Sequence, residues 1–64
     1  MVSRSQEEAK AAREAVASAS ASDAEKAEML MEIAMGMQQK PKSLDDLIEA
    51  IKLYDDAVHL CPES

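Results

Sequence analysis

The sequence predicts an all-α protein of three helices, and three features of its composition support this. Nearly half of the 64 residues are hydrophobic (47%), yet Phe and Trp are absent and Tyr54 is the only aromatic residue. The core must therefore be built from Ala, Leu, Met, Ile and Val, most of which favour helices, and only one Gly and two Pro interrupt them. Strand-forming runs of β-branched and aromatic residues are missing.

The first helix is expected to begin at Ser5, which has capping-box spacing to Glu8, and to end near Ala19. Serine competes for backbone hydrogen bonds, so the serine-rich segment 17–22 should end the helix and act as a short linker. The apolar stripe of this helix is thin and should hold it only loosely. It consists of Ala9, Ala12, Val16 and Ala19.

The second helix has the clearest boundaries. Ser22 and Glu25 repeat the capping-box spacing at its start. Lys40 and Pro41 should end it, because a residue that precedes proline is pushed out of the helical region. Its broad apolar face consists of Ala24, Ala27, Leu30, Met31, Ile33, Ala34 and Met37.

The third helix is expected from Ser43 to about Cys61, and its apolar face is unusually wide. With Leu53 and Leu60 included, the apolar arc reaches roughly 240°. A helix that packs against one neighbour needs an arc of about 100° or somewhat more, so this helix should have neighbours on two sides. The expected central stripe is Leu47, Ile51, Tyr54, Val58 and Cys61, and the polar remainder is Asp45, Glu49, Lys52, Asp56 and His59.

The spacing of small, aromatic and proline residues in the third helix resembles a known repeat family. A small residue, an aromatic, a small residue and a closing proline stand at the spacings of the second half of a tetratricopeptide repeat: Ala50, Tyr54, Ala57 and Pro62. The large, large, small, large pattern of its first half is similar to Leu30, Ile33, Ala34 and Met37.

The resemblance covers about residues 27–62 and implies an antiparallel hairpin. Residues 1–22 are then an N-terminal helix with its linker, and residues 23–64 are the hairpin unit. Small side chains at Ala34 and at Ala50 or Ala57 would let the two helices approach closely. The resemblance further implies a scaffold that binds partner proteins.

A single hairpin cannot cover both flanks of the third helix, because repeat arrays generally need several repeats or caps. We expect the chain to stop after Pro62 because another chain supplies the next repeat. This predicts a homo-oligomer, first of all a two-fold dimer, with the third helix at its interface. The expected contact residues are Leu53, Tyr54, Leu60 and Cys61 of the third helix, with Met29 and Met35 at the edges of the second.

Other functional classes are disfavoured. A net charge of −6 argues against nucleic acid and against an anionic membrane surface as partners. No stretch resembles a signal-peptide core or a membrane span, and a single cysteine fits the reducing cytoplasm. A metal site at Asp55 and His59 is disfavoured because Cys61 lies on the apolar stripe while His59 faces solvent.

Neither a cofactor nor an enzymatic activity is expected. One glycine cannot build a phosphate-binding loop, and the carboxylates are spread along exposed faces. The sequence therefore predicts a non-catalytic module for protein–protein interaction. The alternative is a free-standing, self-associating helical protein of regulatory type.

Overall fold

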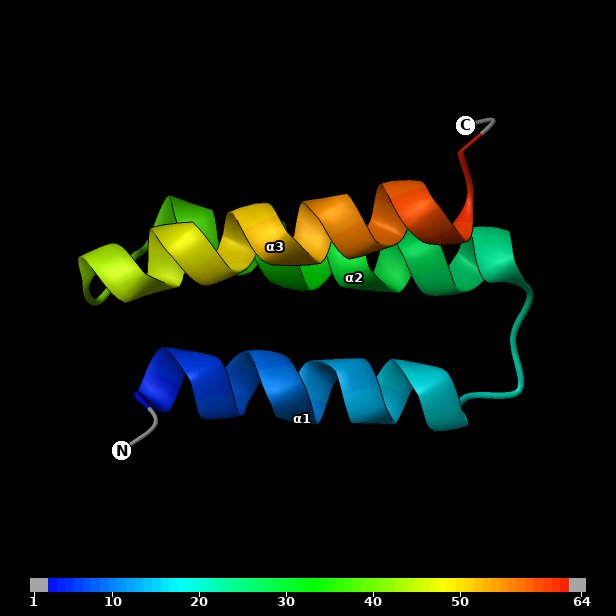
Figure 1. Cartoon of the computed structure of the whole chain (residues 1–64), viewed down its shortest axis with the longest axis horizontal. Coiled ribbons are helices and arrows are strands. Elements are labelled where there is room, and N and C mark those ends of the chain that lie inside the picture. Colours follow the sequence, from blue (N-terminus) through cyan, green and yellow to red (C-terminus); the bar gives the residue numbers. More distant parts are fainter. Residues whose placement is uncertain (1–2, 63–64) are drawn as a thin grey trace.

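Three helices follow one another along the chain: α1 (Arg4–Ser18), α2 (Asp23–Gln39) and α3 (Leu44–Leu60). They are seen in a computed structural model that describes residues 3–62. The helices alternate in direction; α2 and α3 form an antiparallel pair, and α1 lies along one side of that pair (Figure 1). Over the described residues there is no strand, so the prediction of an all-α fold with a helical hairpin is confirmed.

The start of α1 differs from the prediction. Ser3 caps the helix: its Oγ accepts a hydrogen bond from the Gln6 N–H at 3.2 Å, and the Gln6 side chain accepts one from the Ser3 N–H at 3.1 Å. This capping box lies two residues before the predicted one at Ser5 and Glu8, which is therefore wrong. The same Ser-x-x-Gln/Glu spacing occurs twice, and Ser5 makes a tertiary contact instead of a cap.

The boundaries of α2 agree with the sequence. The Ser22 Oγ accepts a hydrogen bond from the Glu25 N–H at 3.2 Å, which satisfies one of the free donors of the first turn. The helix ends at Gln39, and Lys40, which precedes Pro41, has left the helical region with φ −133° and ψ 67°.

Ser43 precedes α3 as predicted, but its side chain makes no capping hydrogen bond. The connection between α2 and α3 is instead held by Asp46, whose Oδ2 accepts a hydrogen bond from the Lys42 N–H at 2.7 Å. The chain therefore reverses direction in the short segment 40–43.

Small side chains dominate the core. Five of its nine buried apolar residues are alanines, and Leu53 is the largest side chain that is fully buried within residues 3–62. The alanines let the helices approach closely, which matches the expectation that Ala34, Ala50 and Ala57 lie inside the hairpin. The nine residues are Ala9, Val16, Ala27, Leu30, Ala34, Met37, Ala50, Leu53 and Ala57.

The first helix contributes little apolar surface to this core. Only Ala9 and Val16 are buried apolar residues of α1. Two polar contacts join α1 to α3: the Ser5 hydroxyl donates a hydrogen bond to Asp46, and the Arg13 Nε donates one to Asp56 at 2.6 Å. These contacts fix the position of α1 along the hairpin.

Candidate interaction surface

The orientation of α3 decides which surface the protein presents. The helix turns a line of mainly small and polar residues inward, made of Asp46, Glu49, Ala50, Leu53 and Ala57. The residues expected at the centre of the buried face point outward instead, since Ile51 is 68% exposed and Val58 is 59% exposed. That expectation is wrong. Alanines on the contact line permit a closer approach to α2 than isoleucine or valine would allow.

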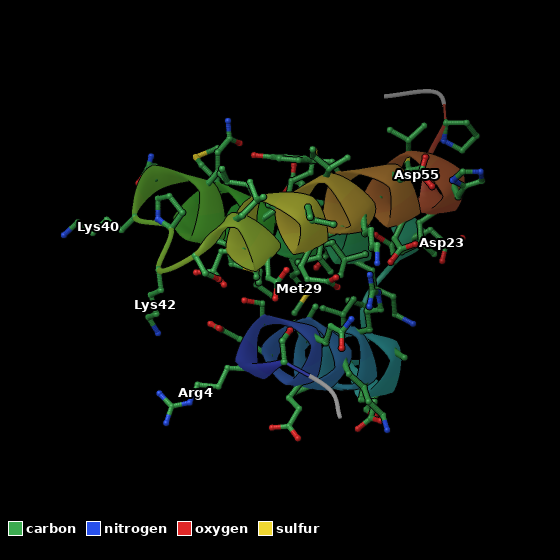
Figure 2. All side chains as sticks on the ribbon, turned by 60° about the vertical axis from the view of Figure 1, so that its left-hand side comes forward. Arg4, Asp23, Met29, Lys40, Lys42 and Asp55 are labelled. Carbon is green, nitrogen blue, oxygen red and sulfur yellow. The ribbon has the colours of Figure 1, made fainter. Side chains whose placement is uncertain are left out.

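Three of the expected contact residues do not lie on an open outer face. Leu53 has no exposed surface, so the prediction that it belongs to an exposed patch is wrong. Leu60 is half-buried and lines a pocket at the α1 side with Val16 and Leu30. Met29 is exposed, but Figure 2 places it between the hairpin and α1.

A largely apolar surface, interrupted by the exposed Asp55, instead follows the outward side of α3. Leu44 is 72% exposed, Ile48 is also exposed, and Tyr54 is half-buried beside them. Asp55, one turn from Ile51, points away from α1 in Figure 2, so this side of α3 is opposite the side that α1 covers. We call this surface the outer strip, defined as Leu44, Ile48, Ile51, Tyr54 and Val58.

The outer strip continues onto α2. The Tyr54 hydroxyl donates a hydrogen bond to the Gln38 Oε1 at 3.3 Å, and a shallow groove lined by Leu47, Ile51 and Gln38 lies between the helices. Of the expected contact residues, Tyr54 also lines this groove. Met35, one turn before Gln38 on α2, is exposed. Cys61, also expected there, is half-buried at the end of α3.

Two carboxylates of α3 are buried while these apolar side chains are exposed. Asp46 accepts hydrogen bonds from the Ser5 hydroxyl and the Lys42 N–H, and these bonds hold the pKa of Asp46 below its usual value. Glu49 was expected on the polar face but is buried, with its Oε2 3.2 Å from the Lys52 Nζ. Within the described residues, every buried side-chain nitrogen and oxygen has a hydrogen-bond partner.

The depressed pKa of Asp46 gives a testable dependence of stability on pH. Its ionised form contributes stability above its ordinary pKa of 3.8, and this contribution is lost as the pH falls through the lower folded-state value. Asp46→Asn should therefore lower the melting temperature at pH 7, and the difference from the wild type should shrink below pH 3.8. Thermal unfolding followed by circular dichroism between pH 7 and pH 2 measures both quantities.

The exposed Glu14→Gln on α1 is the matched control, since it also removes one carboxylate charge. It should leave the melting temperature nearly unchanged at neutral pH. A wild type and Asp46→Asn that melt together at pH 7 would contradict the anchoring role of Asp46.

His59 is held by its own helix. Its Nδ1 donates a hydrogen bond to the Asp55 carbonyl oxygen at 2.8 Å, and the Asp55 carboxylate lies 3.6 Å from the same nitrogen. The backbone hydrogen bond first, and the carboxylate charge second, raise the pKa of His59 above its usual value. No group of three His, Cys, Asp or Glu side chains between residues 3 and 62 is placed to hold a metal ion.

Over the same part of the chain, none of the helices combines the length and the apolarity needed to cross a membrane. Comparisons with protein-family models, with curated proteins and with solved structures found no match to this chain.

Proposed function

We propose that this chain is a non-catalytic protein-interaction module, of the tetratricopeptide-like adaptor type, that binds a protein partner through the outer strip. One observation carries the proposal. The helix α3 buries Asp46 and Glu49 while it leaves Leu44, Ile51 and Val58 largely in water. Buried polar groups and exposed apolar patches are the informative departures from ordinary burial, and contiguous apolar patches mark interaction sites.

The position of the outer strip agrees with the resemblance to a tetratricopeptide repeat. In such arrays each hairpin packs against a neighbour on both flanks, and the stacked neighbours bury a continuous core. Here α1 covers one side of the hairpin (Figure 1), and Asp55, which lies on the same side of α3 as the outer strip, points away from α1 (Figure 2). A partner on the outer strip would take the place that a neighbouring repeat takes in an array.

The chemistry of the surface also favours binding by apolar contact. The buried acidic side chains of α3 are engaged in structural contacts, Asp46 with Ser5 and Glu49 with Lys52. Apart from Asp55, which lies among its residues, the outer strip is formed by Leu, Ile, Val and Tyr, which bind through burial of apolar area. A reducing compartment, with the cytoplasm as the first choice, belongs to the same proposal because the chain has a single cysteine.

Photo-crosslinking tests the proposal directly. A photoreactive phenylalanine analogue at Val58 should yield a covalent adduct with another polypeptide in the source cells, because this position would lie in the interface. The same analogue at Ala15, which is exposed on α1, is the control and should yield none. If adducts are absent at both Val58 and Ile48, the outer strip binds no protein and the proposal fails.

A further inference from the structure

The residues of the outer strip are spaced symmetrically about Ile51. Leu44 and Val58 lie seven residues before and after it, and Ile48 and Tyr54 lie three residues before and after it. These spacings keep all five side chains on one side of α3. A second α3 that runs antiparallel to the first would therefore present apolar side chains at matching positions.

We propose that the occupant of the outer strip is a second copy of this chain, with the two α3 helices packed antiparallel about a two-fold axis at Ile51. The inference rests on the proposed function and names its partner. In this arrangement Leu44 contacts the partner's Val58, Ile48 contacts the partner's Tyr54, and Ile51 contacts its own equivalent. A two-fold interface uses one patch twice, so it requires this self-complementary spacing.

Three charged side chains beside the strip fit the same arrangement, while Asp55, which lies within the strip four residues after Ile51, stays beside its own His59 at 3.6 Å. Asp45, Lys52 and His59 follow one another at seven-residue intervals along one flank of α3. Antiparallel packing places Asp45 beside the partner's His59 at each end, and it aligns the helix dipoles in opposite directions. Lys52 lies beside the axis, where its charge is offset by Glu49 at 3.2 Å.

A dimer of standard size would use a modest share of the surface of the chain. A standard interface buries roughly 800 Å² per partner. The whole chain exposes 4637 Å², so the interface would use about a sixth of it. The outer strip runs along α3 from Leu44 to Val58, about 21 Å. Small domains with thin cores commonly gain stability by association of this kind.

Disulfide trapping tests the two-fold axis. In a Cys61→Ser background, Ile51→Cys should cross-link to itself on mild oxidation, because the two equivalent positions meet on the axis. Leu44→Cys should not, since two such residues would lie about 21 Å apart along the helices. A mixture of Leu44→Cys and Val58→Cys chains should give the mixed dimer.

Analytical ultracentrifugation supplies an independent measurement. The wild type should sediment as a dimer at about 100 μM, and Ile51→Glu should raise the dissociation constant at least about 100-fold. Ala15→Glu adds the same charge on α1 and should leave the dimer intact. Each chain carries a net charge of −6, so added salt should tighten the dimer by screening this repulsion.

The inference would be overturned by a monomeric wild type in which Ile51→Cys forms no cross-link, or by efficient self-linking of Leu44→Cys. It would also be overturned if the outer strip bound only a cationic peptide and added salt released that peptide. The mass of the Val58 photo-adduct separates the two proposals. An adduct with a different protein leaves the interaction module standing while the homodimer fails, and an adduct of twice the chain mass supports both.

Discussion

Leu53→Glu is expected to unfold the chain, whereas Ile51→Glu should leave the monomer folded. The two positions are two residues apart on α3, but Leu53 is fully buried and Ile51 is 68% exposed. A carboxylate at position 53 would be buried without a partner, which is among the most destabilising changes known. A carboxylate at position 51 would lie in water.

The milder substitution Leu53→Ala shows how much free energy of unfolding the buried leucine contributes. Removing a buried leucine side chain costs about 2–5 kcal/mol. A domain of 64 residues has a total stability of roughly 3–10 kcal/mol, so this single change removes much of it. Urea unfolding followed by circular dichroism measures the free energy of unfolding of each variant.

The concentration of the protein matters in this comparison. A dimer stabilises the folded chain by mass action, so Ile51→Glu is best compared with the wild type at low micromolar concentration, where both are monomeric. Equal losses of stability for Leu53→Ala and Ile51→Glu under these conditions would contradict the orientation of α3.

Ala57→Leu should destabilise the hairpin by overpacking, and Ala50→Leu should act in the same way. Both alanines are buried on the line of α3 that faces inward, among the side chains of the core. Three additional carbon atoms at such a site force neighbouring side chains or the helix axes apart, which typically costs about 1–3 kcal/mol. The urea midpoint of each variant measures the effect.

Ala15→Leu is the matched control, because Ala15 is exposed on α1 and the substitution is the same. Leucine and alanine both have high helix propensity, so differences among the three variants report packing and not helix formation. Wild-type urea midpoints for both Ala50→Leu and Ala57→Leu would show that these alanines are not what allows α2 and α3 to approach closely.

The helices themselves are predictable from the sequence because their signals are local. The Ser22 cap and the Lys40–Pro41 stop set the bounds of α2 through atoms only a few residues apart. The predicted start of α1 lies two residues too late for a similarly local reason, since Ser3 and Ser5 have the same spacing to a polar residue three positions further on. The symmetric spacing of the outer-strip residues about Ile51 can also be recognised in the sequence.

The fold class, the three helices and an apolar arc on α3 that is too wide for one neighbour follow from the sequence alone. Which line of α3 is buried depends on tertiary packing, because several lines of the helix are apolar and the buried one lies at the edge of the arc, beside Asp46 and Glu49. Close packing of Ala50 and Ala57 in the core selects one line, and Ser5 and Arg13 of α1 reinforce it by binding Asp46 and Asp56. These contacts join residues more than 40 positions apart, so no local pattern reveals that the isoleucine side of α3 is left in water.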